Sequence, residues 1–218
     1  MKNLHYNILK PKSEAANPPL LLMLHGYGSD ENDLFSFADL LNDRFLVISA
    51  RAPRNLSWGG YAWYDIDFTS NQSRFGNPEQ AEESMEMILQ LISEIQEKYQ
   101  TVISNTVLLG FSQGAILSYG LSLNHPEKFK NILALSGYIF NDIMPKTINS
   151  SEVAHLDFFQ SHGTIDEVIP IDWARKSSEW LKSHGLKHQY IEYPMGHGIN
   201  QDCFNDMIKW IAARYPIL

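Results

Sequence analysis

The stretch TVLLGFSQGA, Thr106 to Ala115, decides the fold of this chain. Its apolar run predicts a buried strand over Thr106–Phe111, and the residues after it predict a helix over Gln113–Leu123. Ser112 therefore falls at a turn from strand to helix, with a glycine two residues away on either side. The two glycines leave room for a sharp turn in which the serine takes a strained backbone and its Oγ stands clear of the sheet. This context predicts that Ser112 is a nucleophile.

Apolar runs of strand length alternate with segments of helical period along the rest of the chain. This alternation predicts an α/β fold with a mostly parallel central sheet and helices on both of its faces. Further strands are expected over Pro19–Leu24, Phe45–Ala50, Asn131–Ser136, Asp157–Ser161 and His188–Tyr193. Further helices are expected over Glu31–Leu41, Pro78–Tyr99, Trp173–Ser183 and Asp202–Arg214.

The helix over Pro78–Tyr99 carries the clearest start signal. Asn77 is a candidate N-cap, Pro78 occupies the first helical position, and Gln80 is placed to complete a capping box. Two longer irregular segments, Arg51–Gly76 and Gly137–Ala154, precede regular elements, and we expect them to form pocket walls near the C-terminal edge of the sheet.

Length and charge limit the classes of protein that the chain can belong to. A chain of 218 residues with 44% hydrophobic content can bury one sizeable core, which predicts a single domain over residues 1–218. The net charge of −8, without a basic run, argues against binding to nucleic acid or to anionic lipid. Exposed aromatic residues leave a homodimer open.

Cysteine usage and hydropathy point to a reducing compartment. Cys203 is the single cysteine, which excludes an intramolecular disulfide and a metal site built from several cysteines, and we interpret it as a packed thiol. The first residues lack a signal-peptide core, and no run of about 18 apolar residues occurs. We therefore expect a cytoplasmic protein without stable membrane insertion.

A serine nucleophile needs a base within hydrogen-bond reach and an acid that orients the base. In α/β-hydrolases the acid and then the base follow the serine along the chain. His197 lies in MetGlyHisGly, between the last expected strand and the last expected helix, where this fold places its base. The other histidines after Ser112 have contexts typical of surface, capping or strand positions: His125, His155, His162, His184 and His188.

Asp166 is the predicted acid, because it lies in the loop directly after the strand Asp157–Ser161. Glu167 and Asp172 are the neighbouring alternatives, and Asp172 has the context of the first turn of a helix. The backbone N–H groups of Tyr27 and Gln113 are the candidate oxyanion donors, since each follows the end of a strand.

Four motifs occur in order along the chain: LeuHisGlyTyrGly, GlyPheSerGlnGly, HisGlyThrIleAspGluValIlePro and GlyHisGly. With them, the sequence resembles the phospholipase/carboxylesterase family of α/β-hydrolases, which includes the acyl-protein thioesterases. The resemblance implies a triad of Ser112, Asp166 and His197 and an oxyanion hole at Tyr27 and Gln113. It also implies hydrolysis of carboxylic esters or thioesters with no cofactor. We expect a small-molecule ester as substrate, no metal, and little or no cap, since 218 residues leave no room for a large insertion.

The chain departs from the family members that act on protein thioesters. It has Tyr27-Gly28-Ser29 in place of Leu-Gly-Asp and Ala115 in place of a second glycine, which favours a carboxylesterase of the bacterial type. The segment Gly59–Ile66 resembles the aromatic segment of the family, so Trp63 and Tyr64 are candidates to line the acyl pocket or to pack in the core. An acyl-protein thioesterase, a lysophospholipase, a peptidase, a lactone hydrolase and an inactive binding protein of the same fold remain alternatives.

Overall fold

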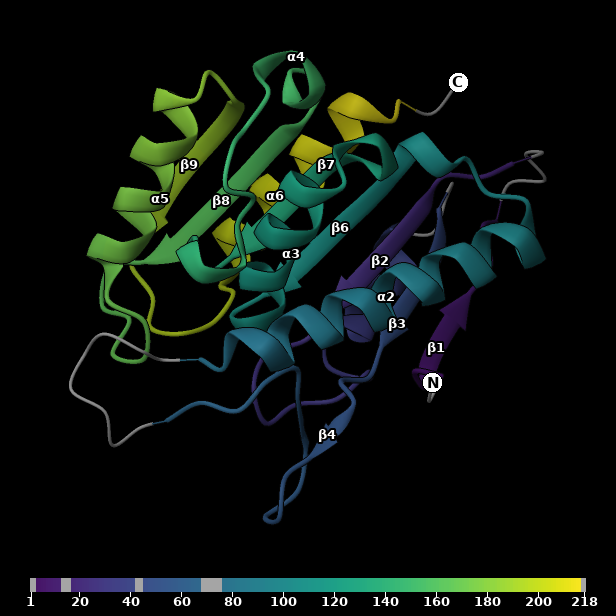
Figure 1. Ribbon diagram of the computed structural model, residues 1–218, viewed down its shortest axis with the longest axis horizontal. Coiled ribbons are helices and arrows are strands. Elements are labelled where there is room, and N and C mark those ends of the chain that lie inside the picture. Colours follow the sequence, from purple (N-terminus) through teal and green to yellow (C-terminus); the bar gives the residue numbers. More distant parts are fainter. Residues whose placement is uncertain (1–2, 13–16, 42–44, 68–75, 217–218) are drawn as a thin grey trace.

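The structure is a computed structural model that describes residues 3–12, 17–41, 45–67 and 76–216. In this part of the chain a seven-stranded sheet has the order β1-β3-β2-β6-β7-β8-β9 (Figure 1). β1 runs antiparallel to β3, and the other neighbours are parallel. The strands are β1 (Tyr6–Leu9), β2 (Leu20–Leu24), β3 (Leu46–Ala50), β6 (Thr106–Phe111), β7 (Phe129–Leu135), β8 (Asp157–Gly163) and β9 (Lys187–Tyr193). A separate hairpin pairs β4 (Arg54–Asn55) with β5 (Tyr61–Ala62).

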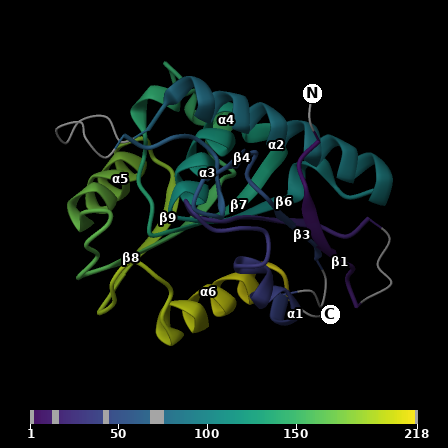
Figure 2. The same ribbon diagram turned by 90° about the horizontal axis from the view of Figure 1, so that it is seen from below.

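Helices cover both faces of the sheet (Figure 2). One face carries α2 (Pro78–Tyr99), α3 (Gln113–Asn124), α4 (Ser150–Val153) and α5 (Ile171–Ser183). The other face carries α1 (Ala38–Leu41) and α6 (Gln201–Arg214). Short 3-10 turns occupy Leu34–Phe37, Ile103–Asn105, Pro126–Lys128 and Asn141–Ile143. This arrangement confirms the predicted α/β-hydrolase fold with a mostly parallel sheet.

The central strands are apolar on both sides because helices bury both faces of a parallel sheet. Along β2, Leu22 packs into the core under α2 and α3, whereas its neighbour Met23 packs into the core under α1 and α6. Along β6, Leu108 and Leu109 divide in the same way. Successive side chains of a strand point to opposite faces, so a continuous apolar run supplies both cores at once.

Two elements differ from the sequence prediction. β1 was not expected, because its four half-buried residues at the sheet edge form no strong apolar run. The helix expected over Glu31–Leu41 reduces to a turn, a 3-10 helix and the short α1. Glu31 is buried and its two carboxylate oxygens each lie 2.5 Å from the guanidinium of Arg51, an ion pair that helps to hold this stretch in its turn. Part of the expected loop Arg51–Gly76, residues 68–75, lies outside the described residues.

The side chain of Asn77 caps the start of α2, but the side chain of Gln80 does not return the bond. The side chain of Asn77 accepts a hydrogen bond from the backbone N–H of Gln80 at 3.0 Å, as predicted. The predicted capping box is wrong, because the side chain of Gln80 does not return to Asn77. It instead exchanges two hydrogen bonds with Asp65, at 2.7 Å and 2.9 Å, and the Asp65 carbonyl accepts the N–H of Asn77. The irregular segment before α2 is thereby fastened to the first turn of the helix.

We expect N77A to lower the free energy of unfolding by about 1 kcal/mol, because one N–H of the first turn loses its acceptor. N77D is the matched control, since aspartate accepts the same hydrogen bond and should keep the stability of the wild type. Chemical denaturation followed by circular dichroism measures both. Equal stability of N77A and N77D would show that the cap contributes nothing measurable.

Candidate active site

The C-terminal ends of β2 and β6 lie side by side at the place where the chain order of the sheet reverses. Leu24 pairs with Gly110, and from this pair the chain continues to β3 on one side and to β7 on the other. Ligands of open α/β sheets bind in the crevice that such a reversal leaves at the carboxyl ends of the strands. Ser112 follows β6 and Tyr27 follows β2, so both residues lie at this crevice.

Ser112 occupies a strained turn between β6 and α3. Its φ of 53° and ψ of −115° lie in a region that residues other than glycine rarely adopt. The turn is this tight because α3 begins directly against the sheet: a Cβ on Gly114 would lie 2.0 Å from the carbonyl oxygen of Leu24. A Cβ on Gly110 would lie 2.4 Å from the carbonyl oxygen of Gly114. Both glycines are therefore required by close backbone contacts, as the sequence predicted.

The structure brings Ser112, His197 and Asp166 together. The Nε2 atom of His197 lies 2.9 Å from the Oγ of Ser112, and its Nδ1 atom lies 2.7 Å from Oδ2 of Asp166. The imidazole packs against the ring of Phe111, with 5.0 Å between ring centroids. Because an ionised carboxylate only accepts hydrogen bonds, Nδ1 carries the hydrogen and Nε2 is left to accept the serine proton.

The carboxylate of Asp166 is fully buried and held by several donors. Its Oδ1 accepts the backbone N–H groups of Val168 and Ile169, each at 2.9 Å, while Oδ2 faces His197. Burial on its own raises the pKa of Asp166, but the hydrogen bonds from His197, Ile169 and Val168 outweigh it and lower the pKa. Asp166 is therefore ionised at neutral pH and lies beside the imidazole of His197.

The other acidic candidates do not contact His197 in this way. Asp172 is exposed on α5 and pairs with Arg175 at 3.2 Å. Glu167 is exposed at the rim of the cavity that contains Ser112. Among the other histidines, His162 alone adjoins the site, where its Nε2 lies 3.3 Å from Oδ2 of Asp166. His125, His155, His184 and His188 lie elsewhere, at helix ends and in the loop before β8 or on β9.

Tyr27 and Gln113 both line the cavity with Ser112 and His197. The segment that carries Tyr27 runs close to the serine, since a Cβ on Gly26 would lie 3.3 Å from the Cβ of Ser112. Gln113 is the first residue of α3, so the positive end of the helix dipole lies at the same place. Both residues predicted to supply oxyanion donors therefore reach the cavity beside Ser112.

The side chain of Gln113 has a role that the sequence did not indicate. Its Oε1 accepts the backbone N–H of Trp63 at 2.8 Å, and its Nε2 donates to the carbonyl of Tyr64 at 2.7 Å. The indole N–H of Trp63 donates to the carbonyl of His25 at 2.9 Å. The glutamine next to Ser112 thus fastens the segment at Trp63 and Tyr64 to the start of α3.

Trp63 and Tyr64 divide between the two alternatives that the sequence left open. Tyr64 lines the cavity, and its ring packs against Phe140 with 6.2 Å between centroids. Trp63 is fully buried in the core behind the cavity wall and is not one of the cavity-lining residues. Of the two alternatives, Trp63 therefore takes the one of packing in the core, and Tyr64 takes the wall of the cavity.

The cavity has a volume of about 510 Å³ and mostly apolar and aromatic walls. Both loops that the sequence nominated contribute, through Tyr64 and Ile66 from one and Tyr138 from the other. Sequence reasoning missed the rest of the wall, which consists of Ile116, Glu167, Val168, Ile169 and Trp173. The apolar pair Val168-Ile169, directly after Asp166 and before Pro170, was the signal that could have identified part of it.

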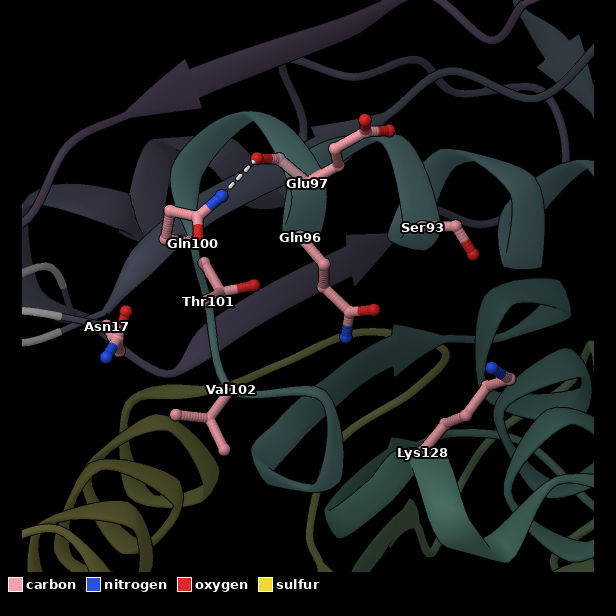
Figure 3. Close-up of a pocket in the computed structure, with 8 residues that line it drawn as sticks. All are labelled: Asn17, Ser93, Gln96, Glu97, Gln100, Thr101, Val102 and Lys128. Carbon is pink, nitrogen blue, oxygen red and sulfur yellow. Dashed lines mark hydrogen bonds between the residues drawn. The ribbon is translucent and has the colours of Figure 1, made fainter.

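A second cavity, of about 540 Å³, lies at the opposite edge of the sheet, where β6 and β7 begin (Figure 3). Its lining residues are of polar types except for Val102, and they include no histidine. In Figure 3 the side chain of Gln100 turns back to donate to the carbonyl of Glu97, at 2.7 Å. The hydroxyl of Ser93 donates to the carbonyl of Leu89 at 3.0 Å. Ser112 and His197 line the first cavity and not this one.

Cys203 lies on α6 in the core and its thiol donates to the hydroxyl of Ser161, with 3.3 Å between sulfur and oxygen. Burial raises the pKa of the Cys203 thiol to about 11, so the sulfur is a packed thiol and not a nucleophile at neutral pH.

Within the described ranges, no group of three or more His, Cys, Asp or Glu side chains is arranged to hold a metal ion. None of the helices found there combines the length and the apolar composition needed to cross a bilayer.

The strained serine, its histidine and the mostly parallel sheet define an α/β-hydrolase of the serine type. The model of the phospholipase/carboxylesterase family matches residues 4–215, nearly the whole chain. The chain belongs to the phospholipase/carboxylesterase family, as the resemblance of its motifs predicted.

Named relatives include both thioesterases and carboxylesterases. Acyl-protein thioesterase 1 of Candida albicans is 28% identical over 225 residues, which cover 92% of this chain and 94% of that protein. Among solved structures, esterase PE8 has a TM-score of 0.82 at 24% identity and covers 97% of this chain and 99% of its own. The Bacillus cereus carboxylesterase has a TM-score of 0.81 at 17% identity, with 96% and 94% covered. The two structural matches support the fold, and the preference for esters over thioesters stays a prediction.

We expect G114A to lower the free energy of unfolding by about 1–3 kcal/mol, because the new methyl group would collide with the carbonyl of Leu24. The turn at Ser112 between β6 and α3 must open to relieve the collision, so a fluorophosphonate probe should label Ser112 more slowly. G198A is the matched control, since a Cβ at Gly198 meets no atom within 4 Å. Thermal unfolding and the labelling rate measure both effects. Wild-type labelling of G114A would show that the tight contact is not needed for the geometry of Ser112.

Proposed function

We propose that this protein is a serine carboxylic-ester hydrolase that works through an acyl-enzyme intermediate, with Ser112 as nucleophile, His197 as base and Asp166 as acid. The observation that carries this proposal is the chain of close contacts from Asp166 through His197 to the Oγ of Ser112, at 2.7 Å and 2.9 Å. The chain ends at an apolar cavity that is large enough for an acyl group. Membership of the phospholipase/carboxylesterase family supports it.

In the acylation half of the reaction, Nε2 of His197 accepts the proton of Ser112 while Oγ forms a bond to the ester carbonyl carbon. The carbonyl oxygen gains negative charge, and the N–H groups of Tyr27 and Gln113 are the proposed donors to it. The tetrahedral intermediate then loses the alcohol, whose oxygen takes the proton from Nε2. The acyl group remains on Ser112 as an ester.

In the deacylation half, a water molecule replaces the alcohol. His197 accepts one proton from the water as its oxygen attacks the acyl carbon, and then returns the proton to Oγ of Ser112 as the carboxylic acid leaves. Asp166 stays ionised throughout, which the hydrogen bonds from Val168 and Ile169 favour. Its charge stabilises the imidazolium that forms in each half reaction.

We expect S112A to abolish labelling by a fluorophosphonate probe, because the probe reacts with an activated serine. In D166N, hydrolysis of a p-nitrophenyl ester should fall by about three to four orders of magnitude, since the amide no longer holds the required tautomer and charge. Thermal unfolding of both variants should stay near that of the wild type. D172N is the matched control, because Asp172 is an exposed neighbour on α5.

Labelling of S112A equal to the wild type would rule out Ser112 as the nucleophile. Normal activity of D166N would point to another acid. Wild-type protein that neither reacts with the probe nor hydrolyses any ester would favour the alternative of an inactive binding protein with the same fold.

A second candidate function is hydrolysis of acyl thioesters. The observation that favours it is the name of the Candida albicans relative, acyl-protein thioesterase 1, which aligns along nearly all of this chain. The departures at Tyr27-Gly28-Ser29 and Ala115 favour oxygen esters instead. A matched oxyester and thioester with the same acyl group distinguish the two candidates through the ratio of their kcat/KM values.

We expect kcat/KM across p-nitrophenyl esters to rise with the first added methylenes and to fall once the chain exceeds the cavity of about 510 Å³. Each methylene buried against Tyr64, Ile116 and Trp173 should favour the transition state until the wall is reached. I116W fills the cavity from α3 and should move the optimum to shorter chains. L40W, at an exposed position on α1, is the control. An unchanged optimum in I116W would show that the acyl group does not occupy this cavity.

A further inference from the structure

His162 lies next to the proposed triad, although the mechanism above does not use it. It is the sixth residue of β8, and its side chain is fully buried. Its Nε2 atom lies 2.9 Å from the carbonyl oxygen of Ile169 and 3.3 Å from Oδ2 of Asp166. This single nitrogen therefore faces both the proposed acid and the end of the turn that carries it.

The neighbours of His162 identify which nitrogen carries the hydrogen. A carbonyl oxygen and a carboxylate oxygen both accept hydrogen bonds, so Nε2 must be the donor. Nδ1 is buried without a hydrogen-bond partner among the described residues. Burial lowers the pKa of His162, against the smaller opposing effects of the Ile169 carbonyl and of Asp166. His162 is therefore a neutral donor, and it does not compete with His197 as a base.

The turn after β8 closes on itself through Asp166 and His162. Oδ1 of Asp166 accepts the backbone N–H groups of Val168 and Ile169, and the carbonyl of Ile169 returns to Nε2 of His162. His162 pairs with Glu192 of β9, and the preceding residue of β8, Ser161, is paired with both β7 and β9, so His162 is held by the sheet. The side chain of His162 thus connects the turn that carries the Asp166 carboxylate to the sheet.

We propose that His162 is a positioning residue for Asp166: its Nε2–H fixes the turn at Ile169 and places a positive dipole beside Oδ2, the oxygen that also meets His197. The inference rests on the proposed function, because it assigns a role relative to that triad. His162 touches no reacting atom in it, so its effect reaches the chemistry only through the distance and the charge between Asp166 and His197.

Other charged groups around His162 are already paired. Glu192 lies opposite it on β9, where both of its carboxylate oxygens bind Arg175 at 2.7 Å and 2.9 Å. His197 lies on the far side of Asp166. Because Glu192 is neutralised by Arg175, Asp166 is the unneutralised carboxylate that the Nε2–H of His162 faces.

The test compares H162M with H162Q. Methionine keeps about the volume of histidine but has no donor, whereas the amide N–H of glutamine reaches about the position of Nε2. We expect kcat/KM of H162M to fall about tenfold, the effect of a lost hydrogen bond beside a charged group, and H162Q to keep most of the activity. We also expect the midpoint of the acidic limb of the kcat/KM profile to move by more than about 0.3 pH unit in H162M and not in H162Q.

The pH profile separates positioning from plain loss of stability, because fewer folded molecules lower the rate at every pH equally. Titration with a fluorophosphonate probe counts the competent sites in each sample. If H162M does not fold, H162N replaces it, since its shorter amide cannot reach the carbonyl of Ile169. H155M is the control, because Nε2 of His155 also meets two carbonyl oxygens, those of Pro126 and Phe129, far from the triad.

The inference would be overturned if kcat/KM of H162M stayed within about twofold of the wild type and the midpoint of its acidic limb moved by less than about 0.3 pH unit. Equal losses in H162M and H162Q would also overturn it, because the donor would then not matter. Wild-type protein without any ester or thioester hydrolysis would instead overturn the proposed function, which is a separate outcome.

Discussion

The contact between Gly114 and the carbonyl of Leu24 is the constraint on which the site depends. It brings the first turn of α3 against the end of β2, and this proximity forces the backbone of Ser112 to a φ of 53°. Such a conformation costs about 1–3 kcal/mol and persists only where the surroundings over-determine it. The N–H of Ser112 donates to the carbonyl of Leu135 at 2.8 Å, so the neighbouring strand holds the turn from the other side. The same approach brings the segments of Tyr27 and Gln113 together.

A second constraint comes from the polar groups around Ser112, which form hydrogen bonds with one another and with the backbone of the neighbouring loops. Gln113 fastens the aromatic segment at Trp63 and Tyr64, and the turn at Asp166 closes through Val168 and Ile169. A buried polar group without a partner is costly, so each of these bonds restricts the alternatives open to its loop. The loops that form the cavity walls are therefore tied to the turn at Ser112, and these hydrogen bonds together stabilise its strained backbone.

The sequence was sufficient where local pattern and fold agree. Buried parallel strands appear as continuous apolar runs, and β2, β6 and β8 were found for that reason. Ser112, Asp166 and His197 could be nominated together because chain order after a strand-to-helix serine leaves few candidates, and the structure brings their side chains within hydrogen-bond distance. The remaining features depend on tertiary contacts with no local signature: the return of Gln80 to Asp65, the burial of Trp63, and the contribution of Ile116 and Trp173 to the cavity. Gln80 and Asp65 are 15 positions apart and Trp63 and Gln113 are 50 apart, and a single sequence carries no record of such pairings.

The chemistry of the acyl-enzyme explains why one family can hold relatives named for esters and for thioesters. With the triad acting as proposed, an oxyester and a thioester with the same acyl group give the same ester on Ser112, so the deacylation step is identical. The cavity wall of Tyr64, Ile116 and Trp173 would contact the acyl group in both cases. Discrimination between the two substrates must therefore arise during acylation. An alcohol leaves only when His197 protonates its oxygen. A thiol is far more acidic than an alcohol, so its thiolate departs with less need of a proton. Under the proposed mechanism, the side of the site that faces the leaving group, and not the acyl pocket, would decide between esters and thioesters.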